Sequence, residues 1–159
     1  EYSALAFANV YGPRQDPHGE AGVVAIFAGM MLDRSRPTIF GDGQQTRDFV
    51  FIEDLVRALR LAATVPDIGG ETFQIATSAE SSIGELVEKL LPALDEAGIP
   101  PPELRHTAPS VGAIQRKFSD TGKARDRLGW QAEIKLSEGL RRTVAWFVER
   151  SRNGAATAA

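Results

Sequence analysis

Four stretches of the chain place apolar residues three and four positions apart, the spacing that gives a helix one apolar face. They span residues 20–34, 53–64, 82–98 and 137–150. The residues expected to face inward are Val23, Ile26, Phe27, Met30 and Met31 in the first helix, Leu55, Leu59 and Ala62 in the second, Ile83, Leu86, Val87, Leu90 and Leu94 in the third, and Leu140, Val144, Phe147 and Val148 in the fourth.

The sequence also predicts where the third helix begins and where the fourth helix ends. The third begins with Ser82-Ile83-Gly84-Glu85, a sequence typical of a capping box, in which two side chains satisfy backbone groups at the helix start. Pro92 lies inside it and is expected to kink or split it, because proline lacks a backbone donor. Beyond the fourth helix, residues 153–159 are small and featureless and are expected to form a disordered tail.

Short apolar runs alternate with the helices. Residues 3–10 read SALAFANV, a mostly apolar run without alternation, which is typical of a strand buried on both faces of a parallel sheet. Further short strands are expected at 71–75, 103–107 and 114–118, and a short helix is expected to end at Leu128-Gly129. This alternation of strands and helices predicts an α/β fold.

The stretch from residue 38 to residue 55 organises the rest. Two β-type runs, 38–40 and 49–51, flank the turn Gly41-Asp42-Gly43, so the sequence predicts a hairpin. Arg47 stands beside the second run, after a polar segment. Two interpretations are open: Arg47 binds an anion such as phosphate, or it is a solvated residue on a surface hairpin. Glu53 and Asp54 are expected to be surface charges in the first turn of the next helix, where the helix dipole favours them.

Composition excludes several classes of function. The net charge of −3 gives no reason to expect a nucleic acid or an anionic membrane as a partner. The chain has no cysteine, and His18 and His106 lie far apart without ligand-like neighbours, so no metal site is expected. No apolar run reaches the ~18 residues of a membrane span, and no secretory signal is recognised. The expected setting is therefore cytoplasmic.

Four motifs, in this order, resemble those of a known family. They are ANVYGPRQDP (residues 8–17), FGDGQQTRDFVFIEDL (40–55), LGW (128–130) and EGLRRTVAWF (138–147). Together they resemble the extended short-chain dehydrogenases/reductases and, more narrowly, the NAD-dependent sugar-nucleotide epimerase/dehydratase family. The resemblance covers nearly all of this chain, which looks like only the C-terminal half of such an enzyme.

The resemblance implies a fold and an activity. Residues 1–11 would be the last, truncated part of an NAD-binding Rossmann sheet, and residues 12–152 a substrate-binding α/β lobe. The implied activity is like that of UDP-glucose 4-epimerase: bound NAD transiently takes a hydride from a sugar carbon, usually C4. The implied partners are a nucleotide-sugar substrate, the missing N-terminal Rossmann domain and a second subunit in a homodimer.

The resemblance also implies site residues. Asn9 and Arg47 match residues at the substrate diphosphate, while Val23 and Phe40 match residues near the nucleotide base. Phe7 matches a residue near the nicotinamide ring and is the implied cofactor contact. For Asn9, the alternative is that its amide satisfies the backbone of the following turn.

The chain departs from the family pattern at the catalytic pair. The family uses a tyrosine followed four residues later by a lysine, but Tyr2 is followed by Ala6 and Tyr11 by Gln15. No catalytic residue is therefore assigned, and this chain alone is expected to be inactive.

A second departure affects the substrate. Ser110 and Ala113 stand where the family commonly carries a diphosphate-binding arginine and an acidic residue. Loss of one charged contact to phosphate would forfeit ~1.5–3 kcal/mol. This departure leaves open an extended short-chain dehydrogenase acting on a smaller, non-nucleotide alcohol or ketone. The missing tyrosine–lysine pair leaves open a non-catalytic binding module on the same fold.

Overall fold

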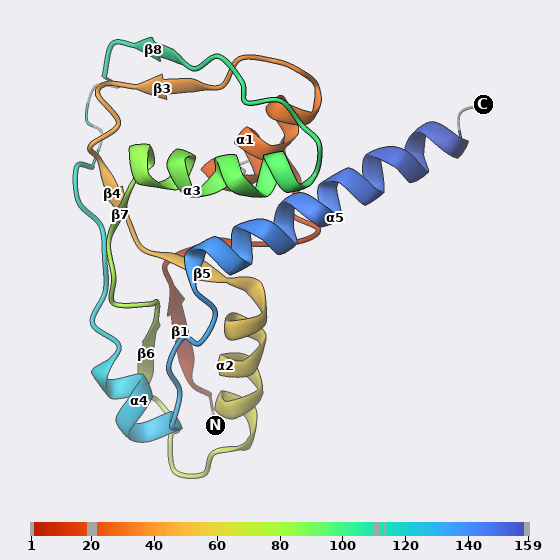
Figure 1. Ribbon diagram of the computed structural model, residues 1–159. Helices are drawn as coiled ribbons and strands as arrows, with labels where there is room; N and C mark the ends of the chain where they lie inside the picture. Colours follow the sequence, from red (N-terminus) through yellow and green to blue (C-terminus); the bar gives the residue numbers. More distant parts are fainter. Residues whose placement is uncertain (1, 19–21, 110–111, 113, 158–159) are drawn as a thin grey trace.

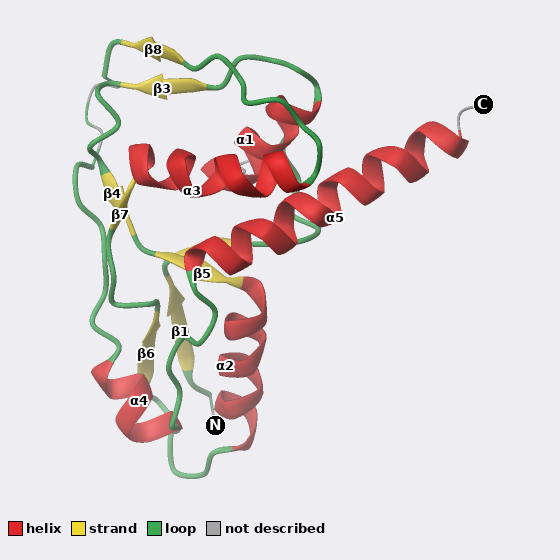
Figure 2. Cartoon of the chain, viewed as in Figure 1, coloured by secondary structure: helices red, strands yellow, loops and turns green. Residues whose placement is uncertain are grey.

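The computed structural model describes residues 2–18, 22–109, 112 and 114–157. Strands and helices alternate along the chain, as the sequence predicts (Figures 1 and 2). The strands are β1 (Ala4–Phe7), β2 (Asn9–Tyr11), β3 (Thr38–Phe40), β4 (Thr46–Arg47), β5 (Phe49–Phe51), β6 (Thr72–Ile75), β7 (Ser81–Ser82) and β8 (Arg105–Thr107). The helices are α1 (Val23–Leu32), α2 (Ile52–Thr64), α3 (Ile83–Glu96), α4 (Gly122–Leu128) and α5 (Leu136–Thr157).

The described strands form four pairs, three of them parallel. β1 pairs with β6, β2 with β5 and β3 with β8 in parallel, while β4 and β7 are antiparallel. Parallel pairs joined through helices confirm the α/β prediction. The strand expected at 114–118 is absent from the described residues of that segment.

The run at residues 3–10 forms two strands, because the chain changes partners at Ala8. The Ala8 amide donates to the carbonyl of Ile75, the last residue of β6, whereas the Asn9 amide donates to the Asp48 carbonyl just before β5. The prediction of burial on both faces is wrong for this chain, since Ala4 and Phe7 are exposed.

The prediction of a central hairpin is also wrong. The turn itself forms, with positive φ at Gly41 and Gly43, a conformation that glycine adopts without strain. Its flanking strands do not pair with each other, however, because β3 pairs with β8 and β5 with β2. Partners supplied by distant parts of the chain have replaced the local pairing.

The helices follow the sequence closely, with differences in their faces and ends. The capping box of α3 forms as predicted, and Pro92 does not split the helix. In α2, Leu55 and Ala58 are buried, whereas Leu59, expected inside, is 47% exposed. α5 continues to Thr157 into the segment expected to be disordered. Alanine, the best helix former, contributes two residues there.

Two main hydrophobic clusters hold the chain together. Side chains of α3, α5, α1 and strands β3 and β5 form the first cluster, which contains Leu86, Leu90 and Leu140. The second cluster surrounds Trp130, which is fully buried against residues of α2, α4 and β6. Figure 1 shows α3 and α5 crossing above the group formed by β1, β6, α2 and α4.

Asp54 is buried, which overturns the prediction that it is a surface charge. Its carboxylate accepts hydrogen bonds from the Arg57 guanidinium and from the backbone amides of Glu133 and Ile134. Its backbone carbonyl accepts a bond from Trp130 Nε1 at 2.9 Å. We call these five residues the Asp54 junction. Residues 130–134 fold back onto α2 here, and no feature of the local sequence predicts this contact.

Candidate functional site

Arg47 and Phe40 line the same cavity, which has a volume of about 620 Å³. The ends of β3 and β8, strand β4 and the exposed segment 114–116 surround this space, which we call the Arg47 pocket. Its lining residues are Phe40, Gly41, Asp42, Gln45, Arg47, Thr107, Pro109 and Gln115. A cavity of this size falls in the range typical of small-molecule sites.

Backbone carbonyls hold the Arg47 side chain in place. Nη1 donates to the Thr46 carbonyl at 2.7 Å and to the Ile114 carbonyl at 2.8 Å. The other donors of the planar guanidinium, on Nε and Nη2, take no part in these two bonds. A partly buried arginine held in this way is suited to binding an anion with its remaining donors.

The neighbouring carboxylate, Asp48, has a structural role. It is buried, and its Oδ1 accepts bonds from the backbone amide and the hydroxyl of Thr77, at 2.8 and 2.6 Å. Asp48 therefore fastens the end of β6 to the start of β5. It does not line the pocket, where a second anion would repel an anionic ligand.

Phe40 is half exposed at the rim of the pocket. Asn9 lies on β2 and is not among the residues that line the Arg47 pocket. The buried Oδ1 of Asn9 has no hydrogen-bond partner among the described residues. Val23 starts α1 and packs against the first cluster, and Phe7 ends β1 with 46% of its surface exposed.

Sequence reasoning missed several polar residues of the site. Gln45 donates from Nε2 to the Phe40 carbonyl at 3.0 Å and closes the glycine turn. Gln115 also lines the pocket, and its carbonyl accepts a bond from the Thr46 amide at 2.8 Å. In the sequence, the only indication that Gln45 and Gln115 belong to the site is that both lie in polar segments. Ser110 and Ala113, the two departures from the family pattern, lie outside the described residues.

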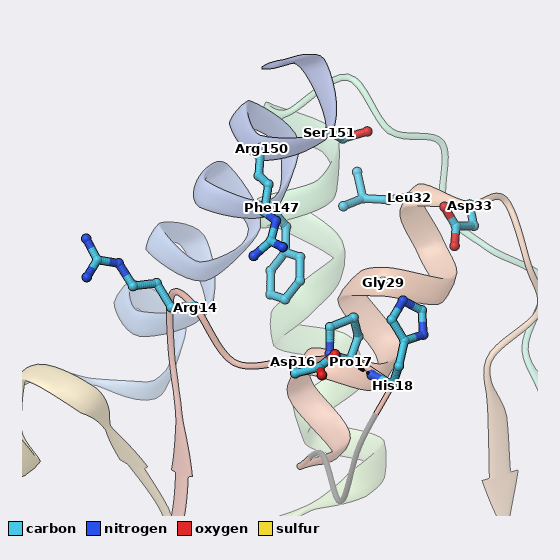
Figure 3. A pocket seen from close by; sticks show the side chains of 10 residues that line it. All are labelled: Arg14, Asp16, Pro17, His18, Gly29, Leu32, Asp33, Phe147, Arg150 and Ser151. Carbon is cyan, nitrogen blue, oxygen red and sulfur yellow. Dashed lines mark hydrogen bonds between the residues drawn. The ribbon is translucent and has the colours of Figure 1, made fainter. Parts of the chain in front are cut away.

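A second cavity, of about 480 Å³, lies between α1, α5 and the loop that follows β2. Figure 3 shows Phe147 and Arg150 on one side of it, Leu32 and Asp33 on the other, and Arg14 pointing away from them. It shares no lining residue with the Arg47 pocket. Charges of both signs border it, so no single class of ligand is favoured.

In the described part of the chain, no group of three or more histidine, aspartate and glutamate side chains is arranged to hold a metal ion. No helix there has the length and apolar character needed to cross a membrane.

The glycine that follows β2 does not form the dinucleotide-binding turn of a Rossmann-type fold. In Rossmann-type folds, a glycine-rich strand–turn–helix lets the dinucleotide pyrophosphate approach the backbone closely. Here the glycine that follows β2, Gly12, faces a side chain: a Cβ built on it would lie 2.5 Å from Ile52 Cγ2. This glycine therefore serves the packing of α2. The exposed Phe7 offers an apolar edge but no donor for a phosphate.

Comparison with known proteins supports the resemblance. Residues 1–76 match the sequence profile of the NAD dependent epimerase/dehydratase family. UDP-glucose 4-epimerase from Mycolicibacterium smegmatis is 44% identical over 150 residues, covering 94% of this chain and 46% of that protein. A putative UDP-glucose 4-epimerase from Methanocaldococcus jannaschii is 41% identical over 152 residues, covering 96% of this chain and 47% of that protein.

A solved structure agrees in fold. The crystal structure of UDP-glucose 4-epimerase from Thermotoga maritima, determined with UDP-glucose, superimposes with a TM-score of 0.84 at 42% identity. The match covers 94% of this chain and 47% of that one. By sequence and by fold, the chain is thus similar to UDP-glucose 4-epimerases and, over residues 1–76, to the NAD dependent epimerase/dehydratase family. It spans about half the length of the relatives that it matches.

Proposed function

We propose that this chain is the substrate-binding portion of an NAD-dependent nucleotide-sugar epimerase or dehydratase that resembles UDP-glucose 4-epimerase. The observation that carries the proposal is Arg47, held by two backbone carbonyls at the wall of a 620 Å³ pocket with Phe40 at its rim. A guanidinium matches the dense charge and planar geometry of a diphosphate. An aromatic side chain at the rim can lie beside a nucleotide base.

The remaining contacts belong to the same proposal. Asn9 would bind the diphosphate by donating from its side-chain Nδ2. Val23, at the start of α1, would approach the base. Phe7 would lie near the nicotinamide, at the exposed end of β1.

The complete enzyme would require more than this chain. We assign residues 1–11 to the end of a Rossmann sheet and residues 12–152 to the substrate lobe. The N-terminal Rossmann domain would bind NAD, which accepts and returns a hydride at the sugar C4, and would supply the catalytic tyrosine and lysine that are not found here. A homodimer and a cytoplasmic setting complete the proposal.

One prediction concerns the cofactor. Because the described residues form no cradle for a pyrophosphate, we expect no measurable NAD binding to the 159-residue chain in calorimetry. The full-length enzyme, measured in parallel, is the positive control. Micromolar NAD binding by the 159-residue chain would contradict the assignment of the cofactor site to another part of the enzyme.

The test of the substrate site is Arg47→Ala in the full-length enzyme, with Arg36→Ala as the matched control. Arg36 is an exposed arginine paired with Glu103 and does not line the pocket. Loss of a charged phosphate contact should weaken UDP-glucose binding by about ten- to a hundredfold, or ~1.5–3 kcal/mol. Melting temperatures should change little in either variant.

The opposite outcome is equally clear. If Arg47→Ala binds UDP- and dTDP-sugars as tightly as the parent but melts much earlier, Arg47 serves the fold alone. The sugar-nucleotide proposal would then lose its main support.

A further inference from the structure

A carboxylate next to the Arg47 pocket joins three parts of the chain. Glu80 directly precedes β7, and its Oε2 accepts bonds from the Thr46 hydroxyl on β4 and from Arg116 Nε, the latter at 3.0 Å. Its Oε1 accepts a second bond from Arg116, from Nη2. The two bonds from Arg116 form a bidentate pair, the strongest arrangement for these two groups. We call Glu80, Thr46 and Arg116 the Glu80 brace.

The brace acts on the segment that contacts Arg47. Residues 114–116 are exposed and have no regular secondary structure. Two bonds connect them directly to β4: the Thr46 amide donates to the Gln115 carbonyl, and Arg47 Nη1 donates to the Ile114 carbonyl. An exposed, irregular segment opens easily, and the bonds from Arg116 to Glu80 attach this segment to the chain at a further point.

We propose that Glu80 is a positioning residue for Arg47. By holding Arg116 and Thr46 together, it keeps the Ile114 carbonyl against the guanidinium, and so holds the remaining donors of Arg47 in the pocket. This inference rests on the proposed function. Hydrogen bonds from Arg116 and then Thr46 lower the pKa of Glu80 to about 2, so the brace stays charged under all conditions in which such an enzyme would be assayed.

The experiment compares sugar-nucleotide affinity in full-length variants, with UDP-glucose as the probe. Glu80→Ala should weaken binding by about three- to thirtyfold, the range found for residues that act through others. Glu80→Gln should have a smaller effect, because the amide oxygen still accepts one of the bonds. The control is Glu103→Ala, which removes an exposed ion pair to Arg36 away from the pocket and should leave affinity unchanged.

A double-mutant cycle separates positioning from a general effect on the fold. If Glu80 acts through Arg47, then Glu80→Ala should cause no further loss of affinity in an Arg47→Ala background. An equal loss in both backgrounds would overturn the inference, as would unchanged affinity in Glu80→Ala alone. Should Glu80→Ala fail to fold, Arg116→Gln releases the same brace from the other side and is subject to the same criteria.

The two proposals fail in different ways. If Arg47→Ala itself leaves UDP-glucose affinity unchanged, the proposed function is wrong. If Arg47→Ala weakens binding and the brace variants do not, the proposed function stands and the role of Glu80 is wrong.

Discussion

The Asp54 junction and the Glu80 brace use the same chemistry for different ends. In each, a carboxylate binds an arginine and fixes a segment that lies far away in the sequence. They differ in their exposure to water. The Asp54 side chain is 2% exposed, while its partner Arg57 is 31% exposed; the corresponding values for Glu80 and Arg116 are 21% and 71%.

This difference separates a structural site from the proposed ligand site. Water screens an exposed ion pair, and its net contribution to stability is small. A buried carboxylate, in contrast, leaves charged and polar partners unsatisfied when it is removed. The Asp54 junction should therefore govern unfolding, whereas the region around Glu80 and Arg47 should govern binding, with little effect on unfolding.

The largest effect is expected from Asp54→Ala. It leaves the backbone amides of Glu133 and Ile134 without their acceptor and removes one of the partners of Arg57. Breaking a buried interaction of this kind lowers the free energy of unfolding by ~3–5 kcal/mol. The measurement is urea denaturation of the full-length protein. The control is Asp126→Ala, which removes an exposed pair with Arg125 and should change stability by less than about 0.5 kcal/mol. If both variants lost the same free energy of unfolding, the buried Asp54 junction would be no more important for stability than an exposed ion pair.

Helix α3 allows the same comparison within one element. Its N-terminal cap lies next to β4 and the Arg47 pocket, whereas its apolar face is buried in the first hydrophobic cluster. Leu90→Ala creates a cavity in the first cluster and should lower the free energy of unfolding by ~2–5 kcal/mol. Ser82→Ala removes the bond that the Glu85 amide donates to the capping hydroxyl, at a loss of ~1 kcal/mol. Denaturation midpoints in the reverse order would refute this assignment of the helix face.

Arg47→Lys tests whether shape matters as well as charge. Lysine keeps the positive charge but cannot reproduce the planar fork of donors. UDP-glucose affinity should therefore fall between that of the parent and that of Arg47→Ala, and the melting temperature should match that of the parent. Affinity equal to the parent's would show that Arg47 contributes charge alone.

The smallest effect concerns pH. The hydrogen bonds from Arg116 and Thr46 lower the pKa of Glu80 from 4.5 to about 2. A depressed pKa means that the stabilisation is fully present above about pH 4.5 and is lost as the pH falls toward about 2. The melting temperatures of the parent and of Glu80→Gln should therefore converge over this interval. A constant difference across the interval would show that the charge of Glu80 is not what holds the brace.

The sequence by itself determined the features that depend on near neighbours. The 3.6-residue periodicity placed α2, α3 and the start of α5, and the capping box and the glycine turn formed where the motifs predicted them. Arg47 and Phe40 could be selected by their motif and do line one pocket. Each of these features depends on residues that are close together in the sequence, so the local sequence is enough to predict it.

Only the tertiary structure decided which distant segments meet. It paired β3 with β8 and β5 with β2, which removed the expected hairpin. It buried Asp54 under residues 130–134, left Asn9 outside the Arg47 pocket, and brought Arg116 to Glu80. The physical reason is that strand partners and burial are chosen by competition among all available surfaces in the folded chain. A residue's own neighbours in sequence do not record the outcome of that competition.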